Sequence, residues 1–414
     1  MKKTLRSLAL AAATSVIATT AMASDTIKIA FIDPLSGGFA STGSNGLKQY
    51  QFAADYFVNE KGGLLGGAKM EVIGFDNKIS PKESLIQLKV AIDQGIRYVT
   101  QGNSSGVAHA LTDAINKHNR RNPDDRVLFL NYSAVDPALT NEDCNFWHFR
   151  FDANADIKMD AMTDIIAQDE SIKKVYVIGQ DYSFGKAVSA AANRMLKDKA
   201  PNVEIVGDEL HPIGKVKDFT PYARKIVASG ADAVITGNWG TDMLGLGTAI
   251  IEAGFDGPIY TYYGAADGIT AAFGEAGKGK IRLVSEGQLS PAPNENVVAM
   301  LREFEKRYPD GNMSQSRIVN VVGMLAKAIE EAGTADDVVK VAYALEGMEY
   351  DSIFGSKLKM RAEDHQIIQD VHIMVHTDEG VVHDYDNSGY APVVESTVEM
   401  ASADAPTTCK MRRP

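Results

Sequence analysis

Two adjacent serines, Ser104 and Ser105, are the first side chains in this sequence whose type and position suggest chemistry. They lie in "QGNSSGVAHALTDAI" (101–115), after the short apolar run "IRYVT" and before a helical pattern. A nucleophile is disfavoured, because the G-x-S-x-G spacing is absent and the other strand-end turns supply no histidine–acid pair. A phosphate loop is also disfavoured, because G-x-x-x-x-G-K-[ST] is absent.

The position of these serines favours binding of another kind of anion. The first N–H groups of a helix have no partner within the helix, and the helix dipole adds positive potential there. A serine hydroxyl contributes one further donor. We expect Ser105 to be the N-cap residue, with Ser104 beside it. The alternative is a serine that caps the helix without any ligand.

Short β-branched runs alternate with longer helical patterns, which is typical of parallel α/β units. The alternation restarts after Cys144, so we predict an α/β fold with two doubly wound parallel-sheet lobes. The first set has strands at 26–32, 70–76, 97–101 and 126–132, with helices around 43–60, 81–94 and from about residue 105. The second set has strands at 173–180, 203–209, 232–239 and 258–263, with helices at 185–199, 218–229 and 241–254.

The turns after these strands are where we expect a ligand, because open parallel sheets bind ligands outside the carboxyl ends of their strands. The turns are rich in glycine, serine and aromatic residues and poor in histidine, glutamate and arginine. This composition suits a binding cleft better than acid–base catalysis, so we expect no catalytic residue and no cofactor. The cysteines and histidines lack zinc-type spacing, so we expect no metal site. The turns are 33–43, 101–108, 131–140, 179–185, 237–243 and 262–267.

The chain begins with a pattern typical of a cleaved secretory signal peptide at residues 1–23. Lys2, Lys3 and Arg6 form the basic region, a short apolar run follows, and "AMA" precedes Ser24. The apolar run falls short of the roughly 20 residues that span a bilayer, and no cysteine follows for a lipid anchor. We therefore expect a soluble periplasmic protein without a membrane anchor.

Charge and length narrow the class of protein further. The formal net charge is −12, and removal of the three basic residues of the signal makes it −15. Nucleic acids and anionic lipids both need a basic face, so neither is an expected partner. The roughly 390 residues of the mature chain suit two domains better than one.

The sequence holds two cysteines, Cys144 and Cys409. An even number in an oxidising compartment allows one disulfide, which would tie the end of the chain to its middle. The alternative is a pair of free thiols.

Several motifs together resemble the periplasmic solute-binding proteins of ABC importers of the branched-chain amino acid (leucine/isoleucine/valine-binding) type. They span nearly all of the mature chain in order. They are "IKIAFIDPLSGGFASTG", "FAADYFVNEKGGLLGG", "QGNSSGVA", "NYSAVDPALT", "FRFDANADIKMDAM", "GQDYSFGKAV", "VKDFTPYARKIVASGADAVITGN" and "AEDHQIIQDVHI".

The resemblance implies a type I periplasmic binding protein, whose two lobes are joined by three crossovers and close on one small organic ligand. It implies an N-terminal lobe of 24–146 plus about 287–355, and a C-terminal lobe of 147–286 plus about 356–390. Residues 391–414 would form a tail. The implied partner is the membrane permease of the importer, and we expect the protein to be a monomer.

The resemblance also assigns the ligand's carboxylate to the serines at 104 and 105. Relatives hold an α-ammonium with a threonine and an acid, but our alignment places Val135 and Tyr263 at those positions, with Ser133 two residues before the valine. An ammonium buried without an acceptor costs several kcal/mol. Asp267 or Asp181 could replace the acid. The usual amino acid site is therefore expected to be incomplete.

Aromatic residues stand where the relatives line their ligand. Trp239 and Phe184 are the expected lining residues, and Thr42 from the turn after the first strand completes the set. One anion-binding site and an aromatic lining suit an apolar or aromatic organic acid. An amino acid, or a quaternary amine held by cation–π contacts, remains an alternative. The other function classes are a ligand-binding module that feeds a sensor, and an exported hydrolase.

Overall fold

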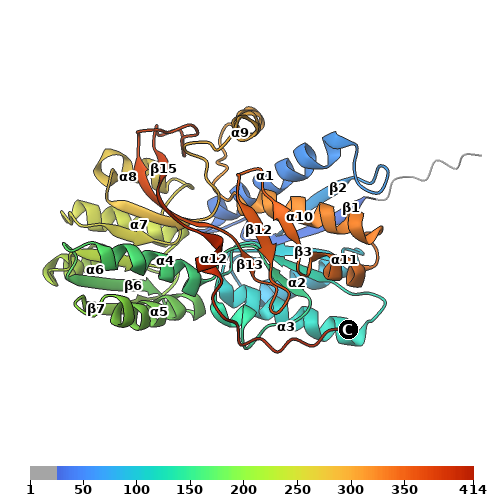
Figure 1. The fold of residues 1–414 in the computed structure, drawn as a ribbon, viewed down its shortest axis with the longest axis horizontal. Helices are drawn as coiled ribbons and strands as arrows, with labels where there is room; N and C mark the ends of the chain where they lie inside the picture. Colours follow the sequence, from blue (N-terminus) through green and yellow to red (C-terminus); the bar gives the residue numbers. More distant parts are fainter. Residues whose placement is uncertain (1–25) are drawn as a thin grey trace, which may run out of the picture.

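The computed structural model describes residues 26–414. The expected signal peptide at 1–23, with its cleavage before Ser24, lies outside the described residues. Figure 1 shows two α/β lobes side by side, with chain segments passing between them several times. Among residues 26–414, no helix combines the length and apolar character needed to cross a bilayer.

The first lobe is built on a five-stranded parallel sheet in the order β2-β1-β3-β4-β5. Every residue of β3 and β4 is buried, as expected for parallel strands that are covered on both faces. Helix α1 packs against α10 and α10 against α11, while α2 packs against α3. The strands are β1 (Ile27–Asp33), β2 (Met70–Asp76), β3 (Tyr98–Gln101), β4 (Leu128–Asn131) and β5 (His148–Arg150). The helices are α1 (Ala40–Phe57), α2 (Pro81–Asp93), α3 (Ser105–Arg121), α9 (Glu295–Arg307), α10 (Arg317–Ala332) and α11 (Val338–Leu345), with short 3₁₀ turns at Asn59–Lys61 and Pro137–Thr140.

The second lobe is built on a seven-stranded sheet in the order β15-β14-β10-β9-β8-β6-β7. Strands β6 to β10 run parallel, whereas β14 pairs antiparallel with both β10 and β15. The strands are β6 (Lys174–Gln180), β7 (Glu204–His211), β8 (Ala233–Thr236), β9 (Ile259–Thr261), β10 (Ile281–Ser285), β14 (Val371–Thr377) and β15 (Ala391–Val398). The helices are α4 (Ala155–Gln168), α5 (Ser183–Lys199), α6 (Thr220–Ala228), α7 (Gly240–Glu252) and α8 (Ile269–Gly277).

Both lobes share one strand arrangement. In the first lobe the chain order reverses between β1 and β3, and in the second it reverses between β6 and β8. Such a switch point leaves a crevice at the carboxyl ends of the strands, where ligands bind. The turns after these four strands are therefore the ones that the fold places at a ligand.

The chain crosses between the lobes three times, as expected for this fold class. The crossings follow β5, β10 and β13, at 151–154, 286–294 and 369–370. A small antiparallel sheet of β11 (Glu349–Asp351), β12 (Lys357–Met360) and β13 (Ile367–Ile368) precedes the third crossing. Its residues Leu358, Met360 and Ile367 pack into the core of the first lobe.

Two expected domain limits differ from the structure. Residues 357–368 were expected in the C-terminal lobe, but Leu358, Met360 and Ile367 pack into the core of the first lobe. Residues 391–398 were expected in the tail, but they form β15 and pair along most of β14. The sheet thereby gains a strand that covers the edge of β14, which would otherwise present unpaired N–H and C=O groups.

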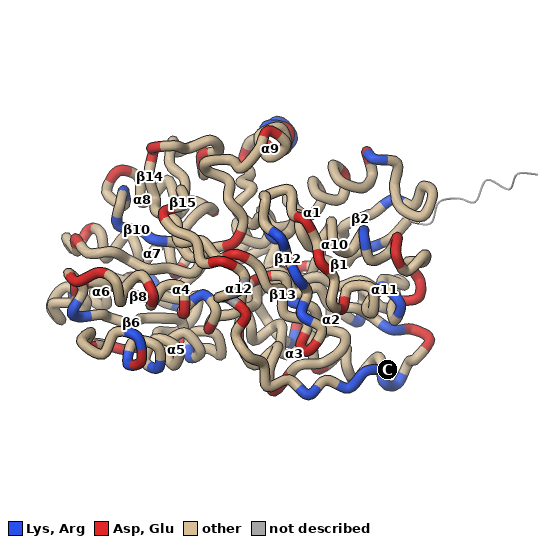
Figure 2. Tube along the Cα trace, viewed as in Figure 1, with Lys and Arg blue, Asp and Glu red and all other residues tan. Residues whose placement is uncertain are grey.

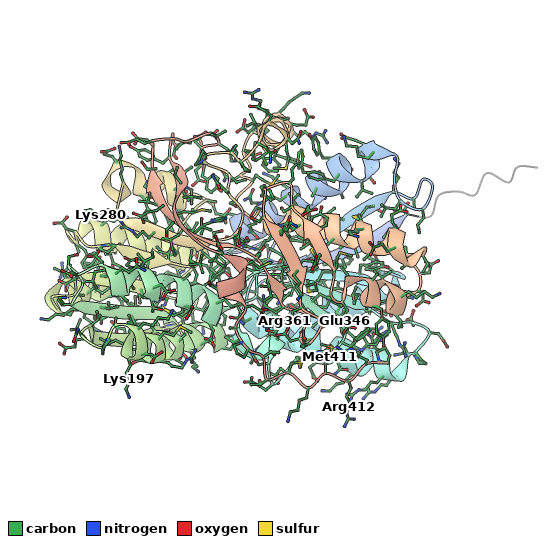
Figure 3. The ribbon with its side chains drawn as sticks, in the orientation of Figure 1. Lys197, Lys280, Glu346, Arg361, Met411 and Arg412 are labelled. Atoms are coloured by element: carbon green, nitrogen blue, oxygen red, sulfur yellow. A yellow bond between two sulfur atoms is a disulfide. The ribbon has the colours of Figure 1, made fainter. Side chains whose placement is uncertain are left out.

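The tail that follows β15 passes from the second lobe to the first (Figure 1). It starts with the short helix α12 (Met400–Ala403) and then follows the surface of the first lobe. Its end is rich in basic residues (Figure 2), and there Arg413 Nη2 lies 2.7 Å from Glu346 Oε1. Figure 3 shows Glu346, Arg361 and Met411 gathered along this path.

The predicted disulfide is present in the tail. Cys409 is bonded to Cys144, and their Cα atoms are 5.8 Å apart. Arg361 Nη1 also lies 2.6 Å from Asp404 Oδ1. Because β15 belongs to the second lobe and Cys144 to the first, the disulfide closes a fourth covalent connection between the lobes.

Candidate functional site

One cleft lies between the carboxyl ends of the two sheets. The empty space of this cleft, including the part open to solvent, amounts to about 720 Å³. Both lobes contribute to its lining. All eight residues expected to bind a ligand line the cleft: Thr42, Ser104, Ser105, Ser133, Val135, Phe184, Trp239 and Tyr263.

The serine turn lies at the start of α3, but its N-cap residue differs from our expectation. Ser104 is the N-cap, with φ of 80°, and Ser105 is the first helical residue. The carbonyl of Ser104 accepts the N–H groups of Val107 and Ala108, so it begins the helix in place of Ser105. Neither serine hydroxyl accepts a capping hydrogen bond from the N–H groups of α3. Both hydroxyls remain beside the positive end of α3 and line the cleft.

A buried carboxylate holds the backbone of this turn by hydrogen bonds. Asp33 accepts the N–H groups of Gly102 (3.1 Å) and Asn103 (3.0 Å) and the hydroxyl of Tyr132 (2.7 Å). Burial raises the pKa of Asp33 to about 7, although these three hydrogen bonds oppose the rise. A side chain at Gly102 would lie 2.6 Å from the Tyr132 ring, so the turn needs glycine there. The serine turn is thus positioned before any ligand arrives.

Aromatic side chains of the second lobe line the opposite side of the cleft. Trp239 lies at the start of α7 and packs against Phe39 of the first lobe, with ring centroids 4.5 Å apart. Its indole Nε1 donates to the hydroxyl of Tyr182 at 2.9 Å. Phe184 packs edge-on against Tyr262 at 5.3 Å. The polar groups of Trp239 are therefore satisfied within the protein, and its ring is available to an apolar ligand.

The hydroxyl of Tyr263 lies against two acceptors of the protein. It is 3.0 Å from the carbonyl oxygen of Ser133 and 3.2 Å from Oδ2 of Asp152. Val135, which follows in the same turn as Ser133, is buried and carries no hydroxyl. These positions therefore offer a ligand fewer acceptors than a threonine and an acid would.

Four charged side chains are buried behind Tyr263. Lys158 Nζ lies 2.7 Å from Asp152 Oδ1, and Arg317 Nη1 lies 2.7 Å from Glu286 Oε1. The pairs are linked, since Lys158 is 3.8 Å from Glu286 and Arg317 is 3.6 Å from Asp152. None of these side chains is more than 4% exposed. The crossover charge cluster of Asp152, Lys158, Glu286 and Arg317 is therefore neutral as a whole.

The charge cluster affects both the pKa values of its acids and the cleft. Burial raises the pKa of Asp152 to about 6, although the charges of Lys158 and Arg317 oppose the rise. Burial also acts to raise the pKa of Glu286, but Arg317 and Lys158 outweigh it and lower the value. Arg317 reaches the cleft, where its Nη2 donates to Ser133 Oγ at 2.9 Å.

An acidic side chain lines the cleft from the loop between β9 and α8. Asp267 has φ of 56°, between Ala266 and Gly268, which also have positive φ. Burial raises the pKa of Asp267 to about 6. Within residues 26–414, no lysine, arginine or histidine nitrogen forms a salt bridge with it. The sequence offered Asp267 as one replacement for the missing acid; the other, Asp181, is 54% exposed and pairs with Lys186.

Several residues in or behind the cleft were missed by the sequence reasoning. Arg317 and Glu286 were not singled out, and Asp33, Asp152 and Lys158 appeared only inside quoted motifs. A usable signal existed for two of them, because Asp33 is an acid at the end of a mostly buried strand and Glu286 directly follows β10. Arg317 had no such signal, since it lies at the start of a helix far from its partners in sequence.

The comparisons with known proteins agree on one family. A family model described as periplasmic binding protein matches residues 26–380. A protein of Brucella melitensis biotype 1 named Leu/Ile/Val-binding protein homolog 4 is 30% identical over 97% of each chain.

Solved structures have the same fold. The closed leucine-, isoleucine-, valine-, threonine- and alanine-binding protein of Brucella ovis has a TM-score of 0.80 and 29% identity, over 94% of this chain and all of that one. A solute-binding protein of an ABC transporter from R. palustris, solved with benzoate, has a TM-score of 0.76 over 93% of this chain and 99% of that one. At 18% identity, the second likeness extends to the fold alone.

Proposed function

The chain belongs to the periplasmic binding protein family, and from this premise we propose that it captures a small organic acid for an ABC importer. The ligand binds in the cleft between the lobes, and the liganded protein delivers it to the importer's permease. We propose that the protein works as a monomer.

The start of α3 supports a carboxylate on the ligand. Ser104 and Ser105 line the cleft at the start of the helix, and Asp33 holds the two residues before them, Gly102 and Asn103. Asp136 N–H donates to Ser105 Oγ at 3.3 Å, so the hydroxyl hydrogen of Ser105 remains available to a ligand oxygen. Charge-assisted hydrogen bonds of this kind are about twice as strong as neutral ones.

The observation that carries the proposal is the position of the Tyr263 hydroxyl. It lies against the Ser133 carbonyl and Asp152, so these acceptors are engaged within the protein. Val135 adds no acceptor. An α-ammonium placed there would lose water without gaining partners, at a cost of several kcal/mol. A carboxylic acid without an α-amino group avoids this cost.

The cleft lining supports an apolar or aromatic body for the acid. Trp239, Phe184 and Tyr262 present ring surface from one lobe, and Val135 and Ala134 add aliphatic surface from the other. The lining residues include serines but no histidine, so a serine hydrolase would lack its general base.

An α-amino acid is the second candidate. The names of the relatives point to branched-chain amino acids, and Asp267 places one carboxylate in the cleft. The two candidates differ in a single group on the ligand, which makes them separable by one pair of compounds.

Calorimetry with leucine and 4-methylpentanoic acid tests the proposal, because the acid is leucine without its amino group. The protein is first unfolded and refolded to remove any ligand that co-purifies. We expect the acid to bind at least tenfold more tightly, since about 1.4 kcal/mol suffices and a lost charged hydrogen bond is worth at least as much. Tighter binding of leucine would contradict the proposal.

Tyr263→Phe tests the observation itself. The variant frees the Ser133 carbonyl and leaves the ring in place, so the difference in affinity between 4-methylpentanoic acid and leucine should become smaller. An unchanged difference in a folded variant would mean that Tyr263 does not determine the preference for the acid.

A further inference from the structure

Asp267 is a cleft carboxylate that the proposed binding of an organic acid does not use. Its neighbour Asp386 provides a comparison, because protein groups engage both Asp386 oxygens. Asp386 Oδ1 accepts from Asn312 Nδ2 at 3.0 Å, and Oδ2 accepts from the Thr270 N–H at 3.0 Å. Asp267 is partly exposed and lines the cleft, and the side chains of Thr42 and Asn45 oppose the rise in its pKa. A carboxylate has several acceptor positions, so a donor from a ligand can bind Asp267 as well.

A buried hydroxyl close to Asp267 is unsatisfied. Thr42 of α1 lines the same part of the cleft and is 7% exposed. Its hydroxyl offsets part of the rise in the pKa of Asp267, so the two side chains are close. Within residues 26–414, however, no protein atom meets hydrogen-bonding distance and angle with Thr42 Oγ1. Buried hydroxyls are normally hydrogen-bonded, so Thr42 independently points to a missing polar partner.

The surroundings of this pair are fixed. Asn45, one turn further along α1, accepts the Asn312 N–H at 2.9 Å and donates to Ser314 Oγ at 3.3 Å. The cation of the cleft that could otherwise neutralise Asp267 is Arg317, which is engaged by Glu286 and Asp152. Asp267 and Thr42 therefore present one acceptor and one hydroxyl to the cleft from opposite lobes.

This part of the cleft is separate from the carboxylate-binding turn. It is formed by α1 and the loop between β9 and α8, whereas the carboxylate-binding turn precedes α3. A ligand whose carboxylate lies at α3 meets Asp267 and Thr42 with another part of its body. A ligand hydroxyl there would donate to Asp267 and accept from Thr42, which satisfies both side chains at once.

We propose that Asp267 and Thr42 form a second polar contact, which selects carboxylic acids that carry a hydroxyl or amine remote from the carboxylate. This inference rests on the proposed function, since it assumes a carboxylate at Ser104 and Ser105. It adds a specificity that the carboxylate-binding turn cannot supply, because that turn is the same for every carboxylic acid.

Calorimetry with matched pairs of acids tests the inference. The pairs are benzoate with 4-hydroxybenzoate and with 4-aminobenzoate, and hexanoate with 6-hydroxyhexanoate. One of the two series, aromatic or aliphatic, will bind more tightly to the wild type. Within that series, we expect the acid with the hydroxyl or amine to have at least tenfold higher affinity than the plain acid. In Asp267→Ala and in Thr42→Val, the preference for the donor-bearing acid should fall to threefold or less.

Asp181→Ala is the matched control, because Asp181 is an exposed acid near the cleft. This variant should keep the full preference for the donor-bearing acid over the plain acid. Thermal unfolding establishes that each variant folds, and Thr42→Val tests the inference should Asp267→Ala fail to fold.

The outcomes separate this inference from the proposed function. Equal binding of plain and donor-bearing acids, or a preference that survives both variants, overturns the inference while the organic acid ligand stands. Binding of leucine but of no plain or hydroxylated acid overturns the proposed function and the inference together.

Discussion

At the scale of single residues, the hydroxyl of Ser105 is oriented by its neighbour. Its oxygen accepts the Asp136 N–H at 3.3 Å, which leaves its hydrogen for an acceptor in the cleft. Ser105→Ala should therefore weaken binding of the acid by about 1.5–3 kcal/mol, the usual contribution of a hydrogen bond to a charged group. Calorimetry with the acid that binds best measures this loss.

A serine outside the cleft gives the control for this prediction. Ser80 caps α2 by accepting the Glu83 N–H at 3.3 Å. Ser80→Ala should cost about 1 kcal/mol of stability and leave affinity unchanged. Unchanged affinity in Ser105→Ala as well would mean that Ser105 serves the fold alone.

Asp267 makes the stability of the ligand-free protein depend on pH. Its pKa is about 6 in the folded protein against 3.8 ordinarily, with burial as the main cause and the nearby Asp386 adding to the rise. Between these values the folded state binds a proton that the unfolded chain has released, so this group's contribution to stability falls as pH rises.

Asp267→Asn isolates this effect, because asparagine does not titrate. The melting temperature of the wild type minus that of the variant should fall between about pH 4 and pH 7. A difference that stays constant across this range would contradict the raised pKa.

The cleft residues divide clearly into those that the sequence could predict and those that it could not. Ser104, Trp239 and Phe184 lie in turns that follow strands, so the strand pattern pointed to these turns, and the family resemblance singled out the two aromatic residues. Arg317 acts through distant partners, since it contacts a residue 184 positions away. A single charged residue with such a separation carries no local signal. The N-cap was misplaced by one residue because nothing local indicates the left-handed φ of Ser104.

At the scale of elements, the crossovers are joined by the charge cluster. Asp152 and Glu286 lie on the first and second crossovers, while Lys158 belongs to α4 of one lobe and Arg317 to α10 of the other. The two negative and two positive charges of this cluster compensate each other away from solvent. Removing one partner of a buried ion pair is costly, because the remaining charge is left uncompensated.

Lys158→Met should therefore destabilise the protein by about 3–5 kcal/mol, measured by urea unfolding. Lys186→Met is the matched control, because Lys186 pairs with Asp181 on the surface at 3.3 Å. Exposed pairs contribute about 0–1 kcal/mol, so the control should change little. A similar small effect in both variants would mean that the buried charges are compensated in another way.

The order and approximate limits of β1 to β4, β6 to β9, α1 to α3 and α5 to α7 could be predicted, because parallel strands are nearly continuous apolar runs. The expected strand at 70–76 has the limits of β2. The remaining helices and strands were not predicted. Among them, β11, β12 and β15 are short or partly exposed, so their residues do not form apolar runs.

At the scale of the whole molecule, the family assignment confirms the resemblance drawn from the motifs. The three crossovers also follow the expected fold class. The tail adds a connection that the fold class does not require, held by the disulfide and by ion pairs of Arg361 and Arg413.

Reduction of this disulfide should lower stability by about 2–4 kcal/mol, because the bond closes a loop of 265 residues. Thermal unfolding with and without a reducing agent measures the effect. The double variant Cys144→Ser with Cys409→Ser should have the lower melting temperature and should not respond to the agent. A reductant effect in that variant would have another origin.

The position of Cys409 makes the disulfide a marker of an intact chain. Cys409 follows every strand of both sheets, and 265 positions separate it from Cys144. Synthesis proceeds from the N-terminus, so a chain that ends before residue 409 contains Cys144 but not Cys409. A chain that is cut between the two cysteines and then loses its C-terminal fragment is in the same state. In both cases Cys144 keeps a free thiol. A thiol-reactive label would then mark damaged molecules and pass over intact ones. The presence of the disulfide therefore shows that a molecule contains the chain from Cys144 to Cys409.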